Sequence, residues 1–128
     1  TASTGDSFKL ALFTSSATIN KSTTDYSTTN EMTNTSGTAY TAGGIALTSV
    51  TPVLDSDTAV CDFSDVSWTS ATFTANGCMI YSTTTGTGSS TTDSVCTIAF
   101  GADKTVTSGT FTIQFPAAAD GTAILEIA

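Results

Sequence analysis

Residues 110–115 have the sequence Thr-Phe-Thr-Ile-Gln-Phe, and this strict alternation of polar and apolar side chains decides the fold class. Successive side chains of an extended strand point to opposite faces, so Phe111, Ile113 and Phe115 share one face. Pro116 ends the pattern, because proline has no amide hydrogen to donate to a neighbouring strand. The stretch therefore predicts a β-strand with one face in a core.

Similar strand patterns occur along the whole chain, whereas helical periodicity is almost absent. The other segments with a strand pattern are residues 7–14, 45–47, 58–63, 71–75, 78–81, 96–100 and 123–128. Residues 78–81 (Cys-Met-Ile-Tyr) are apolar at every position, which favours a central strand covered on both faces. Pro52 indicates an edge strand or a bulge.

Turn and loop signals separate these segments. Gly-Gly at residues 43–44 predicts a turn or a close approach of the backbone, and Asn-Gly at residues 76–77 predicts a turn or a bulge. Residues 101–104 predict a further turn. Two tracts rich in Thr and Ser, residues 15–36 and 82–93, predict long loops.

About seven or eight short strands with long Thr/Ser-rich loops predict an all-β fold, namely a single antiparallel β-sandwich of Ig-like or jelly-roll arrangement. A length of 128 residues fits one domain over residues 1–128. Residues 1–6 are a candidate for a flexible N-terminal arm. The pattern leaves the strand order open.

The charge of the chain limits its partners. Only 11% of the residues are charged, and the formal net charge is −8, with three lysines (Lys9, Lys21, Lys104) and no Arg or His. Nucleic-acid binding needs clustered cations that displace counterions from phosphates, so we expect no nucleic-acid partner. An anionic membrane surface is disfavoured for the same reason. No apolar stretch is long enough for a transmembrane helix, and no signal peptide is visible.

The three cysteines, Cys61, Cys78 and Cys96, are an odd number with long spacings. This favours buried thiols that behave as small apolar side chains. One disulfide with a single cysteine left over is the alternative.

No set of residues in the sequence indicates an enzyme, and we predict no catalytic residues, no cofactor and no metal site. Without histidine, Ser-His-Asp and Cys-His arrangements are impossible. The cluster Asp55-Ser56-Asp57, with Asp62 and Asp65 close by, favours a turn whose carboxylates bond the backbone. A calcium site built on Asp55 and Asp57 is the open alternative.

Four aromatic residues are candidates either for the core or for binding. Trp68 ends an alternating run with Val66, so we expect it to pack in the core or on a sheet face. Tyr26 and Tyr40 lie in polar segments and are the better candidates for an interface or for stacking on a sugar. Tyr81 belongs to the predicted central strand.

Six phrases of the sequence stand out together: residues 8–18 (FKLALFTSSAT), 26–31 (YSTTNE), 40–44 (YTAGG), 62–71 (DFSDVSWTSA), 100–104 (FGADK) and 111–116 (FTIQFP). They resemble a family of small structural proteins of tailed-bacteriophage particles, which is common in phages of aquatic bacteria. Their order and spacing cover nearly the whole chain. The chain departs from the family at Asn76, where many members carry Arg, and at Glu126, where many carry a basic residue.

The resemblance implies a virion structural protein, in particular a capsid decoration (cement) protein on the outer surface of the head. Its expected partners are the major capsid protein and neighbouring copies of itself, as a homotrimer at a three-fold position of the lattice. A tail, fibre or adaptor protein of the particle is the first alternative. A carbohydrate-binding adhesion module is the second, and it would use Tyr26 and Tyr40.

Overall fold

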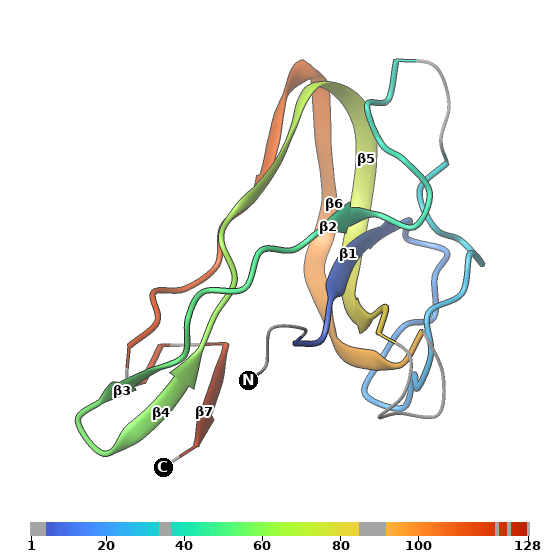
Figure 1. Ribbon diagram of the computed structural model, residues 1–128. Coiled ribbons are helices and arrows are strands. Elements are labelled where there is room, and N and C mark those ends of the chain that lie inside the picture. The colour runs from blue at the N-terminus through green and yellow to red at the C-terminus, as the bar shows by residue number, and fades with distance from the viewer. Residues whose placement is uncertain (1–4, 34–36, 85–91, 120, 123, 128) are drawn as a thin grey trace. The chain divides into compact units, whose positions relative to one another are not determined.

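The computed structural model describes residues 5–33, 37–84, 92–119, 121–122 and 124–127, and every regular element within them is a β-strand. The strands are β1 (Phe8–Phe13), β2 (Ile45–Ala46), β3 (Val53–Asp55), β4 (Thr58–Cys61), β5 (Val66–Ser82), β6 (Ser94–Ile113) and β7 (Leu125–Ile127) (Figure 1). The predicted all-β class is confirmed. Residues 1–4 of the predicted N-terminal arm lie outside the described residues.

The strands form two antiparallel sheets, with the orders β2-β1-β5-β6 and β3-β4-β7. The chain also divides into two compact units. Unit 1 consists of Thr1–Ala46 and Trp68–Phe111, and unit 2 consists of Leu47–Ser67 and Thr112–Ala128. Each unit combines two separate stretches of chain, because β5 and β6 run from one unit into the other. A closed sandwich over residues 1–128 stays a prediction.

The core of unit 1 is built on β1 and the second half of β5. Leu10, Ala11 and Leu12 are fully buried, although their side chains alternate between the two faces of the sheet. The antiparallel register sets Leu10 opposite Ile80 and Leu12 opposite Cys78, whose side chains are also fully buried. The prediction that residues 78–81 form a central strand covered on both faces is confirmed.

β5 and β6 are two long strands, whereas the sequence predicts several shorter strands separated by turns over the same residues. β5 runs without interruption through Asn76 and Gly77, and β6 runs through residues 101–104, so a turn is wrong at both places, and the bulge alternative at residues 76–77 stays a prediction. Asn76 Nδ2 donates to Asp103 Oδ1 of β6 at 2.8 Å. A Cβ on Gly77 would lie 2.9 Å from the carbonyl oxygen of Ile98. Glycine is present here because the β6 backbone passes close by, a role that gives the same sequence signal as a turn.

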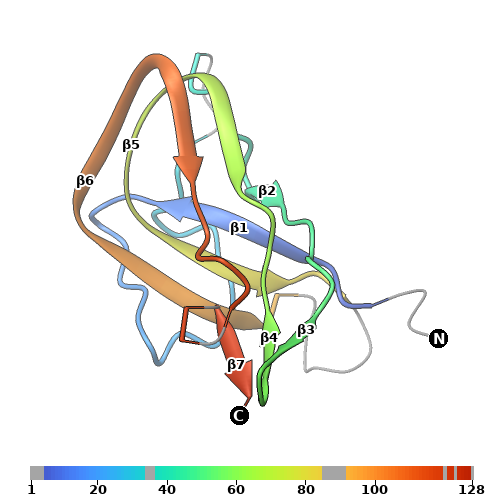
Figure 2. The same cartoon turned by 90° about the vertical axis from the view of Figure 1, so that its left-hand side faces the viewer.

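Both long strands also bend sharply along their length (Figures 1 and 2). Each contains a serine with positive φ, Ser70 in β5 and Ser108 in β6. Rings from the two strands meet beside these positions: the centroids of Phe73 and Phe111 are 5.0 Å apart, and Trp68 contacts Phe73 edge-on at 6.2 Å. Trp68 is 6% exposed, which confirms its predicted place in the core.

Gly44 shows how tightly the turn before β2 sits on β1. Its φ is +82°, and a Cβ there would overlap the backbone carbonyl of Leu10. The Gly-Gly pair at residues 43–44 therefore gives both a turn and a close approach of the backbone, as predicted. Pro52 directly precedes β3, an edge strand, which agrees with the edge alternative.

We expect Gly44→Ala to destabilise the protein by about 2–4 kcal/mol, because positive φ and a backbone overlap both disfavour a Cβ. Gly101→Ala is the matched control, since Gly101 has φ +78° with nothing within 4 Å of the added Cβ. It should lose only about 1 kcal/mol. Urea unfolding of both variants checks this, and equal losses would contradict the role of close packing at Gly44.

Candidate interaction surface

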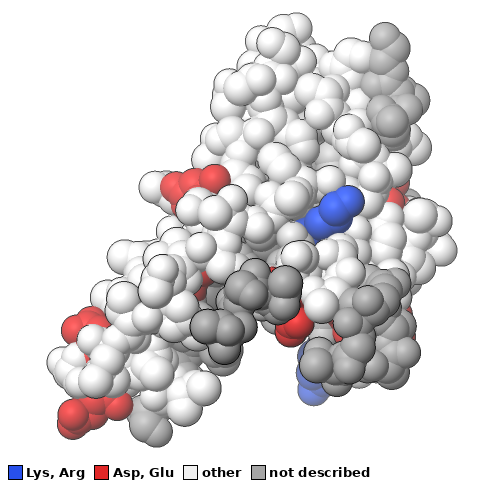
Figure 3. Space-filling model, viewed as in Figure 1, with Lys and Arg blue, Asp and Glu red and all other residues white. Residues whose placement is uncertain are grey.

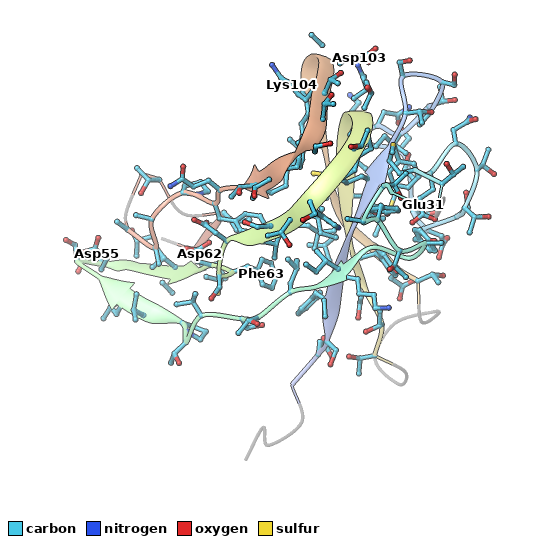
Figure 4. All side chains as sticks on the ribbon, turned by 90° about the horizontal axis from the view of Figure 1, so that it is seen from above. Glu31, Asp55, Asp62, Phe63, Asp103 and Lys104 are labelled. Carbon is cyan, nitrogen blue, oxygen red and sulfur yellow. The ribbon has the colours of Figure 1, made fainter. Side chains whose placement is uncertain are left out.

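The most constrained side chain of unit 1 is a buried carboxylate that the sequence does not single out. Glu31 is 6% exposed and follows the loop after β1, where it forms an isolated bridge with Phe13. Its carboxylate accepts three hydrogen bonds from described residues: from the hydroxyls of Tyr26 and Tyr40, both at 2.6 Å, and from the Gly43 amide at 2.7 Å. Figure 4 shows Glu31 among the loop side chains beside β1.

Further hydrogen bonds tie this group to the sheet. The Tyr40 hydroxyl accepts from the Leu12 amide at 3.0 Å, and the Tyr81 hydroxyl donates to the Gly43 carbonyl at 2.6 Å. The ring of Tyr26 stacks on Tyr81 with a centroid distance of 4.3 Å and an interplanar angle of 8°. The loop is therefore anchored to β1 and β5 through one carboxylate and three phenols.

The electrostatics of this group disfavour acid–base chemistry. Burial raises the pKa of Tyr26 and Tyr40 above 10.0, and the hydrogen bond and the charge of Glu31 raise both further. Burial likewise raises the pKa of Tyr81. A general base needs a pKa near the working pH, whereas these phenols stay protonated there. The arrangement is suited to holding a loop in place.

This geometry corrects the sequence-based view of two tyrosines. Tyr40, a candidate for an interface, is 1% exposed and belongs to the core, so the structure does not support that alternative. Tyr26 is half-buried against a hydrophobic cluster that includes Tyr81. Both lie in polar segments, but their rings are drawn inward because their hydroxyls bond a buried carboxylate. A single Glu in a polar tract gives no signal of this in the sequence.

The cysteines are free thiols at all three positions, so the disulfide alternative is not seen. Cys78 is fully buried as predicted, whereas Cys61 and Cys96 are only partly buried. Burial raises the pKa of Cys78 to about 12, with a smaller contribution from the nearby Cys96, and burial also raises the pKa of Cys96. Both thiols are therefore poor nucleophiles, because the reactive form is the thiolate.

The acidic cluster forms a turn, as the sequence favours. Ser56 and Asp57 connect β3 to β4, and Ser56 has the positive φ found at the first loop position of tight hairpins. The carboxylate of Asp62 accepts from the Phe63 amide and that of Asp65 from the Phe115 amide, both at 2.7 Å. In the part of the chain that the structure describes, no three His, Cys, Asp or Glu residues gather around a common metal position.

Two hollows on unit 1 are lined mainly by Thr, Ser and Asn side chains, with volumes of about 280 and about 560 Å³. Asp25 lines the first, and Lys21 with Cys96 lines the second. Neither hollow pairs a nucleophile of lowered pKa with a base. Among the described residues, every buried side-chain nitrogen and oxygen has a hydrogen-bond partner.

The β3-β4-β7 sheet of unit 2 exposes an apolar face. The antiparallel register aligns Leu54, Ala59 and Ile127 across the three strands, so their side chains share one face. Leu54 is 73% exposed, Ile127 is 65% exposed, and Ala59 is exposed as well. We call this row the outer face. On the opposite face, Val60 of the middle strand is fully buried.

This sheet has further features of a binding surface. β3 and β7 are the two edge strands of this sheet, and the edge of a sheet is a place where another chain can pair. Val53 lies opposite Val60 in the register, on the other face of the sheet from Leu54, and is 44% exposed. Figure 4 shows Asp55 at the tip of the β3–β4 hairpin. The sequence predicts strands at β4 and β7, and for β3 only Pro52 indicates an edge strand or a bulge; it does not indicate that one face of the sheet stays uncovered.

No protein-family model, curated protein or solved structure matches this chain. The described residues contain no helix of the length and hydropathy needed to cross a membrane. The resemblance to phage virion proteins therefore rests on its sequence motifs alone.

Raised tyrosine pKa values predict a loss of stability in alkali. The folded state keeps phenol protons that the unfolded chain releases near pH 10, so this stability is present below pH 10 and is lost as the pH rises further. Tyrosinate absorbance should appear only together with loss of the β circular-dichroism signal. Ionisation of any tyrosine near pH 10 in the folded protein would contradict the Glu31 network.

We expect Glu31→Gln to cost about 1–3 kcal/mol of stability, because an amide offers one oxygen acceptor where the carboxylate offers two. Asp6→Asn is the control, since it removes the same charge at an exposed position and should be nearly neutral. Denaturant unfolding measures both variants. A Glu31→Gln protein as stable as the control would show that the carboxylate does not hold the loop.

Proposed function

We propose that this protein is a structural protein of a tailed-bacteriophage particle, in particular a decoration (cement) protein on the outer surface of the head. The observation that carries the proposal is the outer face of unit 2, where large apolar side chains stay in water beside two open strand edges. Contiguous exposed apolar side chains in a small domain mark an interaction site. Complete burial of Leu54 against a partner would contribute roughly 2 kcal/mol.

The chemistry of the side chains supports a role in assembly over a role in catalysis. The sequence contains no histidine. The phenol groups of Tyr26, Tyr40 and Tyr81 and the thiols of Cys78 and Cys96 have pKa values raised by burial. Such groups neither exchange protons readily at neutral pH nor act as nucleophiles.

The proposed partners are the major capsid protein and neighbouring copies of this chain, assembled as a homotrimer at a three-fold position of the lattice. Many copies would bridge neighbouring capsomers and add interface area that resists the pressure of packaged DNA. A standard interface buries about 800 Å² per partner, which a domain of this size can supply. The proposal includes the antiparallel β-sandwich, Ig-like or jelly-roll, as the fold of the domain.

Purified particles should contain the protein, and particles made without it should assemble normally. They should release their DNA at a lower temperature than complete particles, because the added bridges are missing. A dye that fluoresces on released DNA measures this during heating. Absence of the protein from particles, or an unchanged release temperature, would contradict a cementing role.

The outer face is tested by Leu54→Thr, which removes the apolar side chain but keeps a residue suited to a strand. We expect binding to heads that lack the protein to weaken about tenfold, equivalent to about 1.4 kcal/mol. Val95→Thr is the matched control, because Val95 is a 54% exposed apolar residue of β6 in unit 1. Equal weakening by both variants would place the contact elsewhere.

A position in the tail, a fibre or an adaptor is the first alternative, and the copy number per particle distinguishes it from the head. The second alternative, a carbohydrate-binding adhesion module, loses its expected stacking pair. Tyr40 is buried, and Tyr26 is stacked on Tyr81.

A further inference from the structure

We propose that the outer face of unit 2 docks on a protein surface with an apolar centre and a rim of Lys and Arg, and not on a second copy of this chain. The inference rests on the proposed function for the identity of the partner, the head lattice. The chemistry of the contact follows from the distribution of charge in the chain.

The two units differ strongly in charge. Unit 2 contains six acidic residues and no lysine, a formal charge of −6, whereas unit 1 contains five acidic residues and all three lysines, a formal charge of −2. The acidic residues of unit 2 are Asp55, Asp57, Asp62, Asp65, Asp120 and Glu126. Unit 2 therefore carries most of the net charge of −8 on fewer residues.

Part of this charge lies at the hairpin end of the outer face. The exposed Asp57 is in the turn that connects β3 to β4, and Asp55 is the last residue of β3, where it pairs with Thr58 and alternates to the face opposite Leu54. In Figure 3, acidic side chains gather over the lower left of the visible face, where Figure 1 shows the β3–β4 hairpin, and no lysine lies beside them. An apolar row with a carboxylate border is complementary to an apolar patch with a cationic border.

The same charges oppose a contact between two copies. A face-to-face or edge-to-edge pair of these sheets would bring two units of formal charge −6 together. The Debye length at physiological salt is about 8 Å, so charges at the rim of such a contact would repel each other. The apolar row is also short, because it has one residue per strand. The apolar row alone therefore gives little selectivity, and attraction to a cationic rim on the partner would make docking faster and more selective.

The first arm of the test uses heads that lack the protein, with binding measured by co-sedimentation. Raising the salt from about 50 mM to about 500 mM should weaken binding by about tenfold or more, because rim attraction is screened. Asp57→Lys should weaken binding several-fold and flatten the salt dependence. Asp6→Lys makes the same charge change at an exposed position of unit 1 and should bind like the unmodified protein. Salt-independent binding, or equal effects of the two variants, would overturn the inference.

The second arm needs no phage component and so separates the inference from the proposed function. The probe is a fluorescent peptide of alternating Leu and Lys, with a Leu/Glu peptide as its control. The Leu/Lys peptide should bind, the Leu/Glu peptide should not, and both Leu54→Thr and Asp57→Lys should weaken binding. A Leu/Lys peptide that binds both variants unchanged would overturn the inference while leaving the proposed function intact. If the protein binds the Leu/Lys peptide as expected but does not bind heads that lack it, only the proposed function would be overturned.

Sedimentation of the isolated chain tests whether a second copy of the chain binds the outer face instead. A concentration-dependent oligomer that Leu54→Thr abolishes would show that the outer face binds a second copy, and this would overturn the inference. If the oligomeric state is unchanged by Leu54→Thr, whether monomer or oligomer, the result supports the inference, because the outer face is then not used to bind a second copy.

Discussion

The buried carboxylate of Glu31 is the interaction on which the organisation of unit 1 depends. A charge removed from water is tolerated only where hydrogen bonds replace its hydration, and here two phenols and a backbone amide do so. Because the donors come from Tyr26, Tyr40 and Gly43, satisfying one side chain fixes three points of the long polar segment between β1 and β2. That segment then covers the sheet, although its composition is typical of a surface loop.

The two units use the same Thr-rich, charge-poor chain in different ways. In unit 1, β1 and the second half of β5 are covered on both faces. Tyrosine hydroxyls join the Glu31 network, and some threonine hydroxyls pair across strands, as Thr74 and Thr105 do at 2.8 Å. In unit 2, which contains six acidic residues and no lysine, Val60 on one face of a short sheet is buried, whereas Leu54 and Ile127 on the other face are exposed. The buried core is concentrated in the first arrangement, and the large exposed apolar side chains Leu54 and Ile127 are in the second.

Local patterns predicted much of the strand content correctly. The segments that became β1 and β4 and the central part of β5 were identified, because alternation and apolar runs report which backbone is extended. The errors fall at Asn76, Gly77 and residues 101–104, where small or polar residues within a strand look the same as a turn. At Gly77 the reason lies more than twenty residues away, in the carbonyl of Ile98, and no local window contains it.

The sequence by itself determined the β class, the absence of histidine chemistry and the acidic balance, because these follow from composition and from period-two alternation. Only the tertiary structure decided that Tyr40 is buried and Leu54 exposed. Alternation shows which side chains share a face, but whether that face is covered depends on contacts between distant segments. A tyrosine in a polar tract can therefore belong to the core when its hydroxyl bonds a buried carboxylate, and a leucine in a strand can remain in water when no described segment of the chain packs over it.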